Sequence, residues 1–324
     1  MLRGVLVLVV WVLIGGPALA DPLPSWNDTA AKSEIIAFVE SVTDPASESY
    51  VPSAERIAVF DNDGTLWSEQ PIYFQLLFAV DRLRAMAEAD PSILTSDALK
   101  AAAEGDLQTA LKGGEEALLE IVGVAHSGVS VAEFIEQSGA WLDTARHPET
   151  GRLYKTMVYQ PMLELLRYLR DEGFATYIVS GGGIHFMRAF AEEVYGVPPE
   201  NVIGSVGNSS YQVVDGTPMI MKDPGLAFID DKAGKPIAID RKIGRRPIFV
   251  GGNSDGDFEM LEWSTAGAGP RFGLIVHHTD GDREWAYDRE SHVGRLDRGL
   301  DESPRRGWLL VDMANDWKTV FPGQ

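Results

Sequence analysis

Short apolar segments separated by helical patterns constrain the fold of this chain more than any other feature. Their residues are apolar in succession rather than in alternation, and they lie at 57–60, 175–180, 201–206, 246–252 and 272–278. Strands that are apolar on both faces are typical of parallel sheets covered by helices on each side. Helical patterns lie between several of them, for example at 161–173 and 185–196. The sequence therefore predicts a doubly wound, Rossmann-like α/β core built on a parallel sheet, with a last edge strand within 306–317.

The interval between residues 69 and 155 is far too long for a simple crossover and has little strand character. Apolar residues recur there at i, i+3 and i+4 spacing, which is typical of amphipathic helices. We therefore expect residues 21–68 and 156–324 to form the α/β core and residues 69–155 to form an inserted helical cap. A smaller insertion at 211–223 alternates apolar and polar residues around Asp215-Gly216, which predicts a hairpin.

Residues 1–20 predict a signal peptide. Arg3 precedes an apolar stretch at 5–14, and Ala18-Leu19-Ala20 follows as a cleavage signal. The apolar stretch is shorter than the roughly 20 residues that span a bilayer. An uncleaved anchor is the alternative. With cleavage we expect an exported protein, periplasmic or secreted, without stable membrane association.

Composition excludes several classes of function. The chain has no cysteine, so disulfides, thiolate metal sites and a cysteine nucleophile are ruled out. Its formal charge of −20 repels nucleic acid and anionic lipid. A small soluble molecule is therefore the expected partner.

The strongest chemical signal is the segment at 60–65, FDNDGT, directly after the first apolar run. Neighbouring carboxylates share a proton unless a cation neutralises them, and Mg²⁺ is often bound by one or two carboxylates together with phosphate oxygens. Asp61 and Asp63 therefore predict a magnesium site. A calcium loop of the EF-hand type needs glycine at its sixth position, whereas Gly64 is fourth from Asp61. An aspartate-rich turn without function is the remaining alternative.

Two further loops follow apolar segments. Ser180 ends one segment, and Gly181, Gly182 and Gly183 open the next helical pattern, where free backbone N–H groups favour an anion. Glycine turns between strand and helix are common, so this signal is weak alone. The other loop follows the apolar segment at 246–252 and contains Asn253, Asp255 and Asp257. These residues are either oxygen ligands of a metal or part of a solvated acidic loop.

A cation is also needed to neutralise phosphate. Lys232, Lys235 and Lys242 precede the apolar segment at 246–252, although most lysines simply face solvent.

In this order the residues resemble the haloacid dehalogenase superfamily of phosphohydrolases, on its phosphoserine-phosphatase-like branch, over roughly residues 55–280. The D-x-D-G-T motif is matched by 61–65 and the Ser/Thr motif by Ser180. The family's lysine falls best on Lys235, with Lys232 as competitor. Its G-D-x-x-x-D-x-x-M motif departs at Asn253, which leaves open whether Asn253 or Asp255 completes the metal site with Asp61, Asp63 and Asp257.

The resemblance implies a magnesium-dependent phosphatase acting on a small phosphorylated metabolite. Asp61 would form an aspartyl-phosphate and Asp63 would act as the general acid and base. Ser180, Lys235 and the backbone of Gly181 and Gly182 would hold the phosphate.

Other residues are expected to touch the leaving group. Trp67 and Glu69 follow the first motif closely, and His185 lies near Ser180. Glu69 would bind an ammonium group, or together with Trp67 and Tyr73 would meet a quaternary amine. Residues of this kind also occur simply at the start of a cap helix. A phosphotransferase with the same site and a non-catalytic metal- or ligand-binding protein are the alternative functions.

Overall fold

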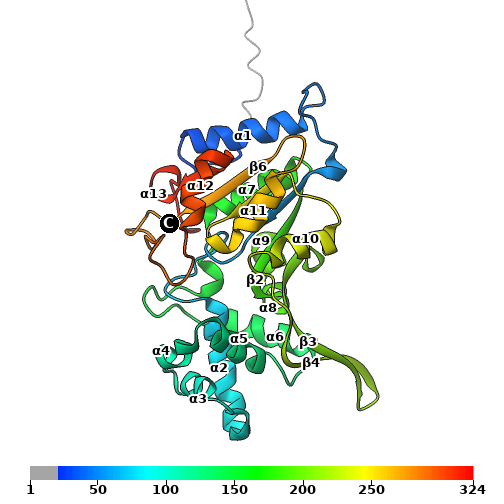
Figure 1. Ribbon diagram of the computed structural model, residues 1–324, viewed down its shortest axis with the longest axis vertical. Helices are drawn as coiled ribbons and strands as arrows, with labels where there is room; N and C mark the ends of the chain where they lie inside the picture. The colour runs from blue at the N-terminus through cyan, green and yellow to red at the C-terminus, as the bar shows by residue number, and fades with distance from the viewer. Residues whose placement is uncertain (1–20, 324) are drawn as a thin grey trace, which may run out of the picture.

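The computed structural model describes residues 21–323, so the signal peptide predicted at 1–20 lies outside the described residues. A seven-stranded sheet in the order β4-β3-β2-β1-β5-β6-β7 forms its centre (Figure 1). The strands are β1 (Ile57–Phe60), β2 (Ala175–Gly183), β3 (Val202–Val214), β4 (Thr217–Phe228), β5 (Phe249–Gly252), β6 (Phe272–His277) and β7 (Leu309–Asp312). The longer helices are α1 (Ala30–Thr43), α2 (Phe74–Ala89), α3 (Asp97–Glu104), α5 (Glu115–Ala125), α6 (Val131–Leu142), α7 (Gln160–Asp171), α10 (Gly234–Ile243), α11 (Phe258–Thr265) and α12 (Arg298–Arg306). Short helices complete the set: α4 (Leu107–Ala110), α8 (Ile184–Arg188), α9 (Ala191–Tyr195) and α13 (Met313–Asp316).

The strand order confirms the predicted fold class. β1 pairs in parallel with β2 on one side and with β5 on the other, and only β4 runs antiparallel, against β3. The later strands lie on both sides of β1, with β2 and β3 on one side and β5 and β6 on the other. The strand order therefore reverses at β1, and such sheets bind ligands at the carboxyl end of the strand where this happens. Asp61 is the first residue after β1.

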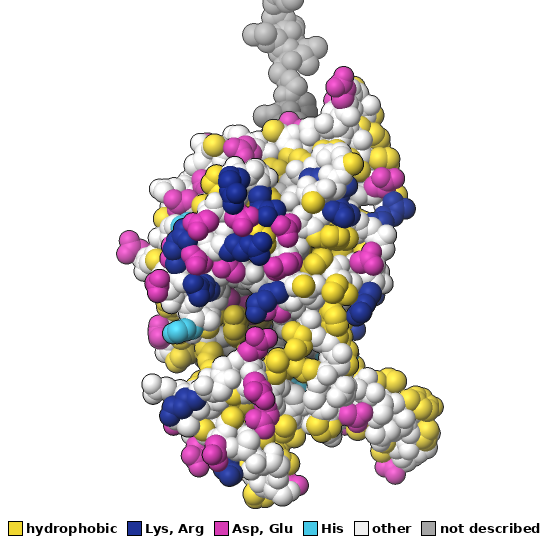
Figure 2. Space-filling model, viewed as in Figure 1, with side chains coloured by type: hydrophobic (Ala, Val, Ile, Leu, Met, Phe, Trp, Pro, Cys, Tyr) yellow, Lys and Arg dark blue, Asp and Glu magenta, His cyan; other side chains and the backbone are white. Residues whose placement is uncertain are grey.

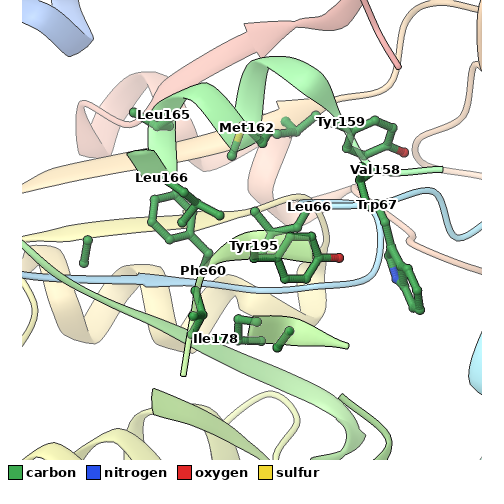
Figure 3. Close-up of a cluster of buried hydrophobic side chains, with 14 of the residues drawn as sticks. Phe60, Leu66, Trp67, Val158, Tyr159, Met162, Leu165, Leu166, Ile178 and Tyr195 are labelled. Atoms are coloured by element: carbon green, nitrogen blue, oxygen red, sulfur yellow. The ribbon is translucent and has the colours of Figure 1, made fainter. Parts of the chain in front are cut away.

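Both faces of the sheet are buried, as the runs of apolar residues predicted. Ala58 and Phe60 pack with α1 and α7, whereas Ile57 and Val59 pack with α10 and α11. Figure 3 shows Leu166 of α7 next to Phe60 of the sheet, with Met162 on the same helix. Full burial of one such side chain stabilises the fold by about 1.5–3 kcal/mol.

Helices α2 to α6 lie between β1 and α7 in sequence and form a body below the sheet (Figure 1). They bury a cluster of their own that includes Leu76, Leu83, Leu99 and Ile121. Two chain segments join this helical cap to the core side by side. Trp67 and Val158 form an antiparallel bridge, flanked by the hydrogen bonds Ser68 N to Met157 O and Tyr159 N to Leu66 O. We call residues 66–68 and 157–159 the neck.

The predicted hairpin is present, and its strands are longer than the sequence indicated. β3 and β4 pair antiparallel up to Val214 and Thr217, with Asp215 and Gly216 both at positive φ in the turn. The hairpin projects from the body and carries exposed apolar side chains near its tip (Figures 1 and 2), including Tyr211 and Val213. Nearer its base, β4 meets the cap.

No helix within residues 21–323 is both long enough and apolar enough to cross a membrane.

Candidate active site

The loop after β1 is shaped by glycine and by close packing. Gly64 has φ +76°, which favours glycine, and a Cβ there would lie 2.0 Å from Asn253 Nδ2 and 2.3 Å from Glu69 Oε1. The carbonyl of Asn62 accepts hydrogen bonds from the N–H groups of the three residues at 65–67. The chain therefore reverses tightly at Gly64 and leaves Asp61 and Asp63 at the end of the central strand.

Lys235 joins two of the predicted acids. Its Nζ donates to Asp61 Oδ1 at 2.5 Å and also to Asp257 Oδ1, and all three side chains are buried. Burial alone would lower the pKa of Lys235, but the carboxylates of Asp257 and Asp61 hold it above its usual value, so this lysine stays charged. Burial and the charge of Asp257 raise the pKa of Asp61, and Lys235 opposes that rise.

Lys235, and not Lys232, is therefore the lysine that lies at the site. Lys235 is in the first turn of α10, with its side chain turned to the carboxyl ends of β1 and β5. Lys232 has φ +49° in the preceding loop and an exposed side chain near Glu115 and Asp231. Lys242, at the other end of α10, is exposed.

Asp63 contacts the second predicted loop. Its Oδ2 accepts from Ser180 Oγ at 3.3 Å, and its Oδ1 accepts from Trp67 Nε1 at 2.9 Å. Burial raises the pKa of Asp63, and the hydrogen bonds from Trp67, Asn62 and Ser180 together with the charge of Lys235 partly oppose that rise. An acid with a raised pKa suits proton donation near neutral pH.

Trp67 was expected to contact the leaving group, and the structure corrects this. Its side chain has no exposed surface and stacks on Phe190 at 4.6 Å between ring centroids, with Phe74 against its edge. Its polar atom is directed at Asp63. Trp67 thus orients a carboxylate from within the core.

Asn253 holds its amide in one orientation. Its Oδ1 accepts from Thr65 Oγ1 at 3.0 Å, and its Nδ2 donates to Glu69 Oε1 at 2.7 Å. Thr65 Oγ1 is also 3.4 Å from Asp61 Oδ2. The Thr65 hydroxyl therefore lies between Asn253 Oδ1 and Asp61 Oδ2, the oxygen of Asp61 that Lys235 does not bind.

Glu69 was expected to bind an amino group of the substrate. It is only 2% exposed, and its Oε1 also accepts from Tyr287 OH at 2.8 Å. Burial raises the pKa of Glu69 well above its usual value, and the hydrogen bonds from Tyr287 and Asn253 oppose the rise. Glu69 is therefore a support for Asn253 behind the site, which corrects the expectation of substrate contact.

Asp255 and Asp257 do not offer their carboxylates to the site as metal ligands. The oxygens of Asp255 accept from the backbone N–H groups of Asp297, Arg298 and Gly299 at the start of α12. Asp257 Oδ2 accepts from the N–H groups of Asn253 and Ser254, and its Oδ1 is bound by Lys235. Asp255 therefore caps a helix, and Asp257 fixes its own loop and the lysine.

The glycines after Ser180 differ from the predicted anion site. β2 continues through Gly183, and α8, which follows, has five residues. The N–H of Gly182 donates to Ser180 Oγ at 3.0 Å, and that of Gly183 donates to Gln75 Oε1 of the cap at 2.8 Å. Two of the amides expected to be free are thus bonded to side chains. His185, in α8, faces Lys222 of β4 rather than Ser180.

The donor set fits Mg²⁺ in chemistry. Within residues 21–323 no three His, Cys, Asp or Glu side chains group together as ligands. Asp61 Oδ2 and Asn253 Oδ1 nevertheless present two hard oxygens, and Mg²⁺ often takes only one or two carboxylates from the protein and completes its shell with water and phosphate. Asp61 and Asp257 are buried and Asp63 is partly buried, all near the cation of Lys235, which leaves negative charge for a metal to neutralise.

Sequence reasoning missed several residues near this site. Tyr287 lies more than two hundred residues from Glu69, and no local pattern connects them. In the sequence, Lys222 lies in the predicted hairpin and His126 lies at the end of a helical pattern, and neither position indicates a site. Thr65 was noted only as part of a motif, although its hydroxyl joins Asp61 to Asn253.

Comparisons with known proteins bear on the fold and on the family. Among solved structures, a functionally unknown protein from Anaerococcus prevotii has 18% identity and a TM-score of 0.54, covering 80% of this chain and 89% of its own. A protein of unknown function from Bordetella pertussis has 16% identity and a TM-score of 0.51, covering 80% and 99%. These likenesses support the fold. A search of curated proteins finds no match.

The family model of haloacid dehalogenase-like hydrolases matches residues 58–262, which include Asp61, Ser180, Lys235 and the 253–257 loop. That span is more than half of the chain. The protein therefore belongs to the haloacid dehalogenase-like hydrolase family.

Proposed function

We propose that this protein is a Mg²⁺-dependent phosphatase that hydrolyses small phosphomonoesters through an aspartyl-phosphate on Asp61. The observation that carries the proposal is the pairing of two acids at the end of β1 with different partners. Asp61 is bound by Lys235, whereas Asp63 is bound by Ser180 and Trp67. Burial raises the pKa of both acids, so their partners distinguish them. Asp61 lies beside a cation that favours its charged, nucleophilic form, whereas Asp63 is bound by two neutral donors and suits acid–base work.

In the first step, the Asp61 carboxylate attacks phosphorus, a new O–P bond forms and the ester O–P bond breaks. Asp63 gives its proton to the leaving oxygen. In the second step, Asp63 takes a proton from water, which attacks the aspartyl-phosphate and releases phosphate and Asp61. Lys235 and the Ser180 hydroxyl hold the phosphoryl oxygens, because this chemistry requires mainly positioning and charge stabilisation.

Asp61 and Asn253 would hold Mg²⁺, which when bound supplies positive charge to the phosphoryl group. Glu69 orients the amide of Asn253 for this purpose, as carboxylates behind metal ligands commonly do.

The proposal extends to substrate size and location. Gln75 of the cap helix α2 contacts the segment after Ser180, and a cap placed beside the site favours a small phosphorylated metabolite over a macromolecule. The acidic composition supports the absence of nucleic acid as a partner. Export to the periplasm or outside the cell rests on the sequence at 1–20 alone.

Turnover of p-nitrophenyl phosphate with and without Mg²⁺ tests the proposal. We expect activity that EDTA abolishes and added Mg²⁺ restores, and we expect Asp61→Asn to lower kcat by at least a thousandfold. Asp240→Asn is the matched control, because Asp240 is exposed on α10, the helix that carries Lys235. Full activity of Asp61→Asn with an intact fold would refute the proposed nucleophile.

A further inference from the structure

A buried lysine without an acidic partner lies where the hairpin meets the cap. Lys222 is 5% exposed, and its Nζ donates to His185 Nδ1 at 3.3 Å and lies 4.4 Å from the ring centroid of Phe134. No carboxylate forms an ion pair with it within residues 21–323. Charged side chains are rarely buried without a group of opposite charge. An anionic ligand would supply the group that this lysine lacks.

The position of Lys222 is fixed by the backbone. Its N–H donates to Val129 O, and its C=O accepts from Gly128 N, both at 2.9 Å. The loop between α5 and α6 thus clamps β4 at this residue. The backbone of Lys222 is thus held in place, and its ammonium group lies between His185 and Phe134.

Other unpaired polar groups surround this lysine. His126 Nε2 and Gln75 Nε2 are buried without hydrogen-bond partners in the described chain. Arg82 adds positive charge, because its guanidinium binds the carbonyls of Ala125 and Ser127 and an amide oxygen but no carboxylate. Burial lowers the pKa of Arg82 and the charge of Glu133 opposes that change, and the carboxylate of Glu133 is bound by Ser130. The cluster therefore has an excess of donors and of positive charge.

The cluster adjoins the proposed phosphate site. A Cβ on Gly183 would lie 2.7 Å from Gln75 Nε2 and 3.7 Å from His126 Nδ1, and one on Gly182 would lie 2.9 Å from Gln75 Oε1 and 3.7 Å from Asp63 Oδ2. The segment 181–183 thus has the general acid at one end and the cationic cluster at the other. The cluster therefore lies on the side of Asp63 from which a leaving group could be held.

We propose that Lys222, with His185 and His126, binds a second anionic group, a carboxylate or a phosphate, on the leaving group of the substrate. This inference rests on the proposed phosphatase function and names the class of its substrate. Burial and the charge of Arg82 lower the pKa of Lys222 to about 8, and burial lowers the pKa of His185 to about 4, which agrees with a site that gains from an incoming anion. The cluster offers no acid to a quaternary amine, so phosphocholine is expected to be a poor substrate.

Matched pairs of probes test this inference. Glycerol 1-phosphate and 3-phosphoglycerate differ in a hydroxymethyl group and a carboxylate, and the mono- and bisphosphates of 1,3-propanediol differ in one phosphate. We expect kcat/KM to be at least tenfold higher for the anionic member of at least one pair, and that pair identifies the anion. In Lys222→Met this preference should fall about tenfold, whereas Lys112→Met, an exposed cap lysine, should leave it unchanged. Equal kcat/KM within both pairs for the wild-type protein would overturn the inference, whether or not the variants fold.

Binding to Asp61→Asn separates this inference from the proposed function. Calorimetry should show tighter binding of the preferred anionic probe than of its partner in that variant. If the wild-type protein hydrolyses no phosphomonoester, the proposed function fails, and this difference in affinity still tests the anion subsite. Equal affinities would overturn the subsite alone.

Discussion

Replacing Asp230 with asparagine is expected to stabilise the folded protein, and increasingly so as the pH rises. Asp230 follows β4 and has no exposed surface, and neither of its carboxylate oxygens has a hydrogen-bond partner within residues 21–323. Burial raises its pKa from 3.8 to about 7, against the attraction of Lys235. The charged form is therefore costly in the folded state and costs nothing extra in the unfolded chain.

The sign and size of this change in the free energy of unfolding follow from proton linkage. Between pH 4 and 7 the folded state keeps a proton on Asp230 that the unfolded state has lost, so stability falls as the pH rises through this window. The interval from 3.8 to about 7, at roughly 1.4 kcal/mol for each pH unit, corresponds to a penalty of about 4 kcal/mol above pH 7. Asparagine does not titrate. We expect a gain of about 1–2 kcal/mol at pH 5 and about 3–4 kcal/mol at pH 8.

Urea unfolding of both proteins at these two pH values measures the difference. Asp240→Asn, on an exposed side chain, should show no gain at either pH. A gain of the same size at pH 5 and pH 8, or a loss at pH 8, would refute the view that Asp230 is buried without compensation.

Three further outcomes are expected. Lys235→Met should destabilise the fold by about 3–5 kcal/mol, because it leaves two buried carboxylates without their cation, and Asp257→Asn in the same chain should recover part of this loss in urea unfolding. Gly64→Ala should abolish phosphatase activity, since its Cβ would overlap Asn253 and Glu69; wild-type kcat would contradict the packing. Glu69→Gln should weaken Mg²⁺ about 10–100-fold, measured as the Mg²⁺ concentration that raises Tm, and an unchanged concentration would show that Glu69 does not orient Asn253.

The fold was predictable because its signals are local. Consecutive apolar residues at 57–60 fill both faces of a central strand, and the same residues form β1. Asp215-Gly216 predicted the hairpin turn because both residues adopt positive φ there. The helical pattern at 185–196, in contrast, forms two short helices, α8 and α9. Phe190, between them, stacks on Trp67, a contact that no local pattern records.

The site was predictable in part. The sequence predicted that Asp61, Asp63 and Ser180 lie together, because motifs at the ends of parallel strands converge at one edge of the sheet, and the structure brings them together there. Among the lysines, the sequence favoured Lys235 but left Lys232 open, since the choice depends on which side chain the first turn of α10 directs inward. The sequence also did not show which way each carboxylate points. Asp255 had the appearance of a ligand, and only the placement of α12 shows that it is a helix cap.

The two attachments of the helical cap limit how it can move. The neck joins it to the core at one place, and the clamp on Lys222 joins it to the hairpin at another. These two backbone attachments, with the hydrogen bond from Gly183 N to Gln75 Oε1 of the cap, restrict the cap to small movements relative to the core. Wider opening would require the loss of both backbone hydrogen bonds at Lys222, each contributing about 0.5–1.5 kcal/mol, or bending of the hairpin along with the cap. Entry of a substrate would therefore depend on movement of β3 and β4, which lie far along the chain from Asp61 and Asp63.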